Sequence, residues 1–214
     1  MNIELLGWAT LLGFLWYQII AHYGISIGLH RYFSHNQFKC NTIHESVMLF
    51  MIMIAGARSP IGWIAAHRMH HTYSETEKDP HAYQNIGYLR ALLSIWNIKK
   101  IPPRFARDLY NNPRLVWCHK HWLHFIVVWW IITMLIHPYF FLSFAFIPFV
   151  LSKAGFGLLN VICHWNGVRD VWWMNWILGG DGFHKTHHDN PKKLRLHKWD
   201  AGGWIAEKVF NRVG

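Results

Sequence analysis

Eight of the 17 histidines fall into three short boxes whose spacings could bind metal ions. One box has the spacing H-x4-H and two have the spacing H-x-x-H-H. In chain order the boxes contain His30 and His35, then His67, His70 and His71, and then His184, His187 and His188. At this histidine frequency, about 0.1 H-x-x-H-H boxes would be expected by chance. Imidazole is a common ligand of transition metals, so a shared metal centre would explain all three boxes.

Helix geometry predicts how the boxes present their imidazoles. Positions i, i+3 and i+4 lie on one face of an α-helix, so each H-x-x-H-H box is expected to form half of a metal site. His30 and His35 are separated by about 140° around a helix, so the helix is expected to end or bend between them, near Ser34. Other histidines are expected to be packed or hydrogen-bonded, not ligands; these are His22, His44, His119, His121, His124, His137 and His197.

A long uncharged segment near the N-terminus predicts a transmembrane helix. No Lys, Arg, Asp or Glu occurs from Leu5 to Leu29, and about 20 apolar residues suffice to cross the hydrocarbon core of a bilayer. The composition agrees, because the chain is 52% hydrophobic and 17% aromatic, which exceeds the usual content of a soluble domain. A secretory signal peptide is the alternative, but the segment lacks a basic start and a small-residue cleavage site.

A second apolar region predicts a helical hairpin. It runs from Phe125 to Val150 and on to His164, too long for one span, and is expected to turn at His137-Pro138-Tyr139. The segment from Val47 to Ile64 is expected to lie in the membrane interface or to dip into it, because one crossing would separate the first two boxes. The predicted fold is an all-α integral membrane protein with about three transmembrane helices, an interfacial helix and a helical cap carrying the boxes, in a single domain of residues 1–214.

Basic residues are distributed unevenly along the chain. Lys and Arg gather after the second box and around the third, whereas Met1 to Glu4 and the turn at Pro138 contain none. By the positive-inside rule, all boxes are predicted to be cytoplasmic. The same bias explains the formal net charge of +10; no nucleic-acid motif is present, and membrane lipid headgroups are the expected partners. The three cysteines form no C-x-x-C pair, which favours a reducing compartment without disulfides.

Motifs around the boxes carry a resemblance to a known family. They are Gly24-Ile-Ser-Ile-Gly-Leu-His30, Ser59-Pro-Ile-Gly-Trp63, Ser74-Glu-Thr-Glu-Lys-Asp79-Pro80-His81, Asn160-Val-Ile-Cys-His164 and Gly180-Asp181-Gly182-Phe183. From roughly Tyr23 to Pro191, the chain resembles the membrane fatty-acid desaturases, in particular the Δ9 acyl-CoA and acyl-lipid type, which includes stearoyl-CoA desaturase. It is an unusually short member, with one span before the first box where the family commonly has two. Asp181 stands where the family usually has Glu.

The resemblance implies a ninth histidine ligand and a di-iron centre. His164 matches a ligand on the family's last membrane helix, and Asn160, on the same helix face, matches a residue that approaches the metal through water. The implied ligands are His30, His35, His67, His70, His71, His164, His184, His187 and His188. Nine neutral nitrogen donors are too many for one ion but enough for two, and imidazole suits iron. Zinc binds the same groups without redox chemistry, and it can replace iron on overexpression.

The implied reaction is the O2-dependent introduction of a cis double bond, at Δ9 in the family, into a long-chain acyl-CoA or acyl-lipid. Removing hydrogen from unactivated methylenes requires a redox metal, because no side chain can do so as an acid or a base. The chain has no fused heme domain and no iron–sulfur cysteine set. Electrons are therefore expected from a separate donor of the ferredoxin or cytochrome b5 type.

Carboxylates near the boxes have two interpretations. Asp79, Asp181 and Asp189 could orient the N–H groups of the ligating histidines, or they could cap helices and face solvent. For Asp79 and Asp181 both interpretations stay open at this point.

Other single residues are candidates for substrate contacts. Trp63 lies four residues before His67 and could line the acyl channel, or it could be an interfacial aromatic residue. Arg104 and Arg107 could hold a phosphate-bearing carrier, or they could follow the positive-inside bias.

Two rival functions share parts of this pattern. A membrane di-iron fatty-acid hydroxylase or alkane monooxygenase would use similar boxes, although Asp79-Pro80-His81 and Asn160-x3-His164 favour desaturation. A non-catalytic membrane metal or heme carrier belongs to another class. Heme needs one or two axial histidines, and a transporter would hold its ligands near the bilayer midplane, so triplets at helix ends disfavour both.

Overall fold

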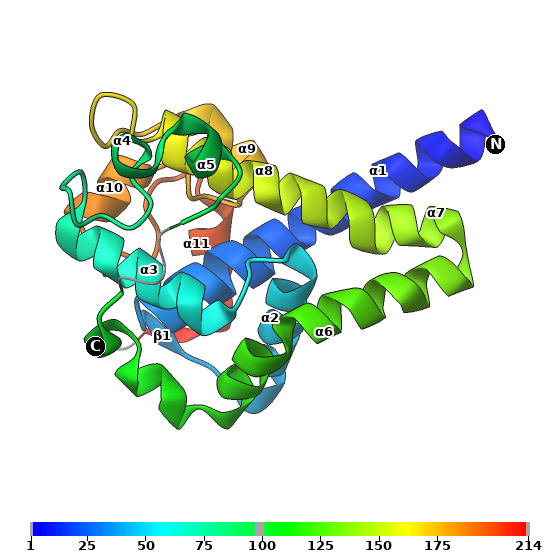
Figure 1. The fold of residues 1–214 in the computed structure, drawn as a ribbon, viewed down its shortest axis with the longest axis horizontal. Coiled ribbons are helices and arrows are strands. Elements are labelled where there is room, and N and C mark those ends of the chain that lie inside the picture. Colours follow the sequence, from blue (N-terminus) through cyan, green and yellow to red (C-terminus); the bar gives the residue numbers. More distant parts are fainter. Residues whose placement is uncertain (1, 97–100, 213–214) are drawn as a thin grey trace.

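The computed structural model describes residues 2–96 and 101–212, which form a helical protein with a narrow arm and a wider head (Figure 1). The longest helical segments are α1 (Ile3–Ile19), the π-helix η1 (Ile20–Ser34), α2 (Thr42–Ala55), α3 (Pro60–Tyr73), α6 (Pro113–Ile136) and α8 (Ile147–Ile162). Shorter segments are α4 (Tyr83–Ile86), α5 (Tyr88–Leu92), η3 (Pro103–Phe105), η4 (Arg107–Asn111), α7 (Pro138–Phe141), η5 (Leu142–Phe146), η6 (Trp172–Met174), α9 (Asn175–Leu178), α10 (His184–Asp189) and α11 (Ala201–Val209). Strands β1 (Phe38–Lys39) and β2 (Asn211–Arg212) form one antiparallel pair.

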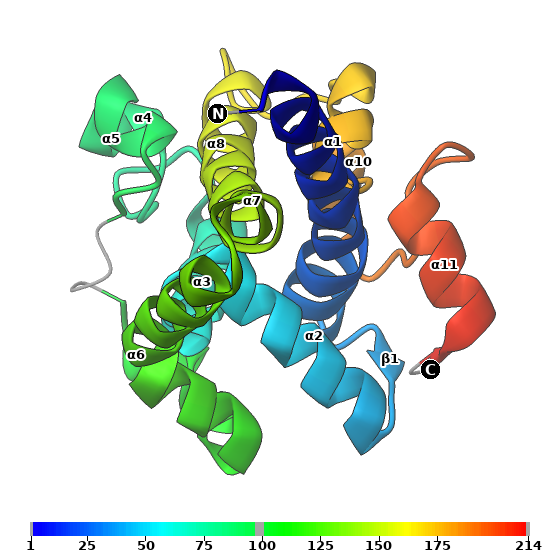
Figure 2. The ribbon, with the colours of Figure 1, turned by 90° about the vertical axis from the view of Figure 1, so that its right-hand side faces the viewer.

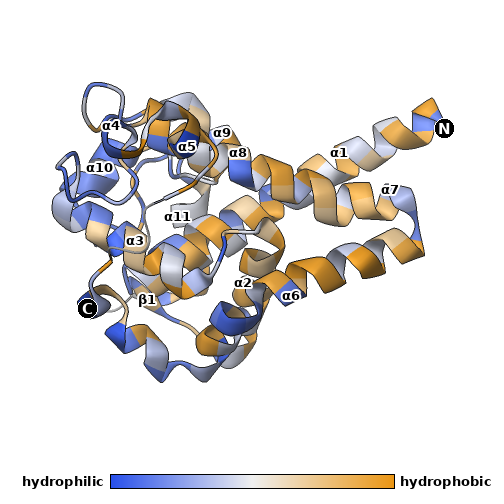
Figure 3. Cartoon of the chain, viewed as in Figure 1, coloured by the Kyte–Doolittle hydropathy of each residue, from blue (hydrophilic) through white to orange (hydrophobic). Residues whose placement is uncertain are grey.

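Within the described residues, three helices are long and apolar enough to cross a membrane. They span Ile3–Ser34, Pro113–Ile136 and Pro138–Ile162. Their apolar residues cover the arm, whereas polar residues gather on the head (Figure 3). Side chains such as Leu135, which is 81% exposed, would be costly in water and suit a lipid environment. The predicted all-α membrane architecture is confirmed, and the N-terminal span reaches beyond the predicted limits of Leu5 and Leu29.

Polar residues fix where the long helices begin. The side-chain oxygen of Asn41 accepts a hydrogen bond from the backbone N–H of His44, and Ser59 does the same for Gly62. Asn112 caps α6 in this way, and Pro113 follows at the first helical position, where a missing N–H costs nothing. The hairpin helix therefore begins well before the predicted Phe125.

The predicted hairpin turn is present. His137 has an extended backbone, its ring accepts a hydrogen bond from the N–H of Tyr139, and Pro138 begins the returning helix. Proline cannot continue the preceding helix because it lacks an N–H and restricts the residue before it. Ser143 then donates to the carbonyl of Ala9, which joins the returning helix to α1.

Helices α2 and α3 form a sharply bent pair instead of one straight helix. Their axes differ by 88° across a short break. Gly56 ends α2 with a φ of 64°, a left-handed conformation that favours glycine. By length and composition the pair is a broken span or a re-entrant loop. The bend agrees with the prediction that Val47 to Ile64 makes no simple crossing.

The first helix changes its hydrogen-bonding pattern where it enters the head. From Ile20 to Ser34 it is a π-helix, with bonds between residues five apart, and the N–H of His35 bonds the carbonyl of His30 at 3.2 Å. The helix ends at Ser34, between these two histidines, as predicted, and His35 is the capping residue just beyond it. Five residues complete roughly one turn of a π-helix, which brings both histidines to the same face.

The C-terminal segment closes the head on the side away from α4 and α5 (Figure 2). Helix α11 packs against η1, and β2 pairs with β1, so that Phe38 lies opposite Arg212. Phe210 stacks on Phe38 with ring centroids 4.4 Å apart. The last part of the chain is thus attached directly to the helix that carries the first histidine box.

We expect Gly56→Ala to destabilise the protein by about 1 to 3 kcal/mol. The added methyl group would meet the ring of Phe149, and alanine disfavours the left-handed backbone at this position. The measurement is the thermal unfolding midpoint of the purified protein in detergent.

The matched control is Gly7→Ala in the arm, where an added methyl group has no neighbour within 4 Å. The midpoint of this variant should be unchanged or slightly higher. Equal losses in both variants would contradict a special role for the bend at Gly56.

Candidate metal centre

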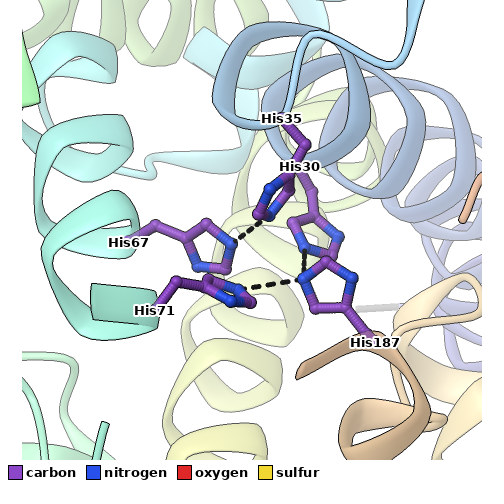
Figure 4. A group of neighbouring side chains, drawn as sticks. All are labelled: His30, His35, His67, His71 and His187. Carbon is purple, nitrogen blue, oxygen red and sulfur yellow. Dashed lines mark hydrogen bonds between the residues drawn. The ribbon is translucent and has the colours of Figure 1, made fainter. Parts of the chain in front are cut away.

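The boxed histidines and His164 converge in the head as two adjacent groups. Within each group, one ring nitrogen of every histidine lies within 4.8 Å of the others. The first group, drawn in Figure 4, contains His30, His35, His67, His71 and His187. The second group contains His70, His164, His184 and His188. The two groups share no histidine, and together they account for all nine positions singled out in the sequence.

Each H-x-x-H-H box supplies both groups. From α3, His67 and His71 face the first group and His70 faces the second. Residues four apart differ by about 40° around a helix, whereas the residue at i+3 points about 60° to the other side, so a triplet can divide between two centres.

Helix α10 divides in the same way, with His184 and His188 in one group and His187 in the other. The expectation that each box forms one half-site is therefore corrected, because both boxes extend across both groups. The rings of His71 and His188, one from each group, stack with centroids 4.2 Å apart.

Three buried or half-buried carboxylates fix the orientation of three rings. Each accepts a hydrogen bond from Nδ1 of one histidine: Asp181 from His30 at 3.1 Å, Asp79 from His70 at 2.6 Å, and Glu75 from His164 at 2.6 Å. An ionised carboxylate only accepts hydrogen bonds, so Nδ1 carries the proton and Nε2 of the neutral ring carries a lone pair.

The Nε2 atoms of several histidines lie within hydrogen-bonding distance of one another, but these rings have too few N–H groups to make every contact a hydrogen bond. Nε2 of His187 lies 2.9 Å from Nε2 of both His30 and His71. Nε2 of His184 lies 2.8 Å from Nε2 of His164 and 3.2 Å from Nε2 of His188. One ring nitrogen cannot donate to two neighbours, and His30 and His164 present lone pairs here. A cation between such nitrogens would bind the lone pairs, so the residues fit a metal centre.

Burial keeps the ligating rings in the neutral form. It lowers the pKa of His184 and of His187 well below the usual range, and it lowers the pKa of His188 to about 3. Neutral imidazole is the form that binds metal ions. At neutral pH these three histidines are therefore already in the form that binds a metal ion.

A narrow apolar cavity, with a free volume of about 40 Å³, adjoins both groups. Trp63 lines it and stacks on His67, with ring centroids 5.0 Å apart and an interplanar angle of 14°. Asn160 also lines the cavity, and its buried Nδ2 has no hydrogen-bond partner among the described residues. A bound water would satisfy this donor. This agrees with the resemblance, which implies that Asn160 approaches the metal through a water molecule.

Comparison of the sequence with known proteins finds relatives that share one activity. No family profile matches the chain. The chain is 26% identical to the sn-1 stearoyl-lipid 9-desaturase of Anabaena variabilis, over 97% of this chain and 82% of the relative. It is 25% identical to Delta-9 acyl-lipid desaturase 2 of Arabidopsis thaliana, over 97% and 72% respectively. It is 28% identical to an acyl-CoA Delta(11) desaturase of Spodoptera littoralis, over 88% and 62%. Over 88–97% of its length the chain is therefore similar to membrane fatty-acid desaturases, which are oxidoreductases.

The sequence did not single out two residues that lie beside the histidine groups, Glu75 and His81. Both belong to the polar stretch after the second box, which was given no role at the metal centre beyond that of Asp79. Glu75 contacts His164 from 89 residues away in the chain, and no spacing rule predicts a contact of that separation. The ring of His81 is buried, 4.1 Å from that of His70 and 4.8 Å from that of Trp96.

Several other residues predicted to act at the site lie away from the histidine groups. Asp189 pairs with Lys185 at 2.6 Å on the surface and contacts no boxed histidine. Arg104 donates to the hydroxyl of Tyr73 at 2.6 Å, and Arg107 lines a separate groove. Among the described residues, the seven histidines expected to be packed also stay outside both groups.

Because the groups share no histidine, we expect each to lose its metal independently. The double variants His35→Ala/His71→Ala and His164→Ala/His184→Ala should each lower the metal content of the purified protein by about half. Inductively coupled plasma mass spectrometry would measure the metal content.

The control is His121→Ala/His124→Ala, which removes two exposed histidines of α6. Its metal content should equal that of the wild type. Complete loss of metal from either site variant would indicate one indivisible centre instead of two.

Proposed function

We propose that the chain is an O2-dependent fatty-acyl desaturase that introduces a cis double bond, at Δ9, into a long-chain acyl group. The observation that carries the proposal is the pair of histidine groups, with facing lone pairs, at one end of an apolar cavity. The names of the relatives support the regiochemistry, since two of them are described as 9-desaturases. Nine histidine nitrogens are proposed to hold two iron ions.

The choice of iron follows from the reaction and the donors. Two bound irons supply the O2-dependent redox chemistry that removes hydrogen from unactivated methylenes. Zinc would bind the same imidazoles but could not support this chemistry. A protein loaded with zinc during overexpression would therefore be folded and inactive.

The chain's own residues hold and shield the centre. Asp79, Asp181 and Glu75 each accept a hydrogen bond from a ring N–H, which sets the orientation of the ring and directs its Nε2 inward. Trp63 covers His67 and forms part of the cavity wall. An apolar wall beside the histidines excludes water from the methylenes that would react.

The residues that line the cavity extend away from the histidines, along the path that an acyl chain would take. Its walls run from the histidines along η1 and α1 to Tyr17, and along α8 from Asn160 to Ser152. At the rise of a helix, these distances are roughly 12 to 20 Å. The lining is mainly apolar, with Ile25, Phe156 and Leu178 among its residues.

Both coenzyme A and a glycerolipid are open as carriers of the acyl group, since the relatives include acyl-lipid and acyl-CoA desaturases. Arg107 lines a groove of about 630 Å³ beside α3, where a phosphate-bearing carrier could bind. Arg104 is bonded to Tyr73 and is the weaker candidate.

The proposed orientation puts the head in the cytoplasm. The excess of Lys and Arg around the second and third boxes supports this orientation. Electrons would then come from a separate cytoplasmic or membrane-bound donor of the ferredoxin or cytochrome b5 type.

The direct test is the fatty-acid profile of cells that express the chain, measured by gas chromatography and mass spectrometry with double-bond positions assigned. We expect new Δ9 monounsaturated acids with the wild type and none with His70→Ala, because His70 faces the second group. Membrane insertion of the variant should be unaffected.

The control for this test is His121→Ala, which should give the wild-type profile. Hydroxy acids in place of unsaturated acids would favour the hydroxylase. An active His70→Ala protein would disprove the assigned site.

The cavity makes a second prediction, about chain length. Ser152 is 1% exposed, lines the far end of the cavity, and its hydroxyl has no hydrogen-bond partner among the described residues. We expect Ser152→Leu to shorten the cavity and to raise the ratio of shorter to longer products by about tenfold or more.

Ser152→Ala is the matched control, because it removes the hydroxyl without filling the cavity. Its product ratio should be close to that of the wild type. If Ser152→Leu leaves the ratio unchanged while the protein stays active, the acyl chain does not lie in this cavity.

A further inference from the structure

Arg31 follows the first histidine of the first box, and its side chain is buried, with 1% of its surface exposed. Its Nε donates to the carbonyl of Leu194 at 3.0 Å, and its Nη2 to Oδ2 of Asp200 at 2.8 Å. Its Nη1 donates to the carbonyl of Ser26 at 3.1 Å and to the hydroxyl of the same residue. Burying a guanidinium is costly unless its donors are satisfied, so this arrangement requires an explanation.

Asp200 ties Arg31 to the C-terminal segment of residues 194–210. It is fully buried, and its carboxylate accepts hydrogen bonds from the backbone N–H groups of Leu196 and Gly203, each at 2.8 Å. The second bond caps α11. A glycine at position 202 lets the segment approach, because a methyl group there would lie 3.3 Å from Nη1 of Arg31.

Arg31 also reaches the carboxylate that orients His30. Oδ1 of Asp181 accepts three hydrogen bonds: from Nδ1 of His30 at 3.1 Å, from the hydroxyl of Ser26 at 2.9 Å, and from Nη1 of Arg31 at 3.4 Å. The guanidinium therefore holds Asp181 both directly and through Ser26. If Arg31 moved, Oδ1 of Asp181 would move with it, and the hydrogen bond that orients the ring of His30 would be disturbed.

The second histidine group is held without such an arginine. Oδ1 of Asp79 accepts hydrogen bonds from the backbone N–H groups of His81 and Ala82, at 3.1 and 3.2 Å. Glu75 accepts a bond from the amide of Gln84 at 2.8 Å. Among the described residues, no Lys or Arg forms an ion pair with Asp79 or Glu75. The two groups thus depend on different supports.

We propose that Arg31 is a positioning residue for the group of His30, His35, His67, His71 and His187 alone, and that it couples the docking of the C-terminal segment to metal binding there. The proposal rests on the metal centre of the proposed function. It separates two roles for Arg31: a general role in stability would affect both groups equally, whereas a positioning role affects only the first.

The test is the affinity for Co²⁺, followed by its absorption spectrum in purified full-length protein. The variant His164→Ala/His184→Ala retains the first group, and His35→Ala/His71→Ala retains the second. We expect Arg31→Lys, which keeps the charge and loses the fork of donors, to weaken Co²⁺ binding about 10- to 100-fold when only the first group is retained. It should leave binding unchanged when only the second group is retained.

Asp200→Asn provides a second, milder variant, because the single amide oxygen of asparagine can still accept the hydrogen bond from the N–H of Gly203 that caps α11, whereas its Nδ2 cannot accept one from Arg31. It should weaken Co²⁺ binding to the first group alone, by less than Arg31→Lys. Arg114→Lys is the control: this arginine pairs with the buried Glu45 at 2.8 Å, away from the histidines, and its change should alter neither affinity.

Each other outcome is decisive. Unchanged binding to the first group in both variants, or equal losses in both groups, would overturn the inference and leave the proposed function intact. Failure of the wild-type chain to bind Co²⁺ would instead overturn the proposed function, and the inference with it.

Discussion

The structure depends on one electrostatic constraint, the close approach of neutral imidazoles whose Nε2 lone pairs point at one another. His30 and His164 cannot turn their lone pairs away, because their Nδ1 protons are held by Asp181 and Glu75. The arrangement is repulsive until a cation enters. The rest of the protein must therefore hold four chain segments in fixed relative positions. These are the end of η1, α3, the turn just after α8, and α10.

The membrane part and the head divide this task. The three long helices place the ends of η1 and α8 on the same side, and the bend between α2 and α3 returns the second box to that side. Close packing supports the bend: a methyl group added to Gly24 would lie 2.6 Å from Cβ of Met51. The apolar cavity follows from the same geometry, since α1 and α8 extend away from the histidines and leave space between their apolar faces.

Sequence reasoning predicted the elements and the chemistry better than the way they fit together. The uncharged run after Leu5, the proline at position 138 and the spacings of the boxes are local signals, and the spans, the hairpin and the eight boxed histidines follow from them. The ninth histidine, His164, was predicted only by the resemblance to a family. The π-helix was missed because α- and π-helical segments of this length have the same composition. The contact of Glu75 with His164 and the burial of Arg31 were missed because they depend on contacts between segments far apart in the chain, which no local pattern specifies.

The division of α3 and α10 between two groups has a consequence for how such a protein is made. During synthesis, His30 to His71 leave the ribosome long before His164 to His188, so neither group has a full set of donors until the third box has emerged. A metal ion encountered earlier would meet only four imidazoles of the first group and one of the second. Assembly of the centre is in this way deferred until α8, the last of the three long apolar helices, has been synthesised.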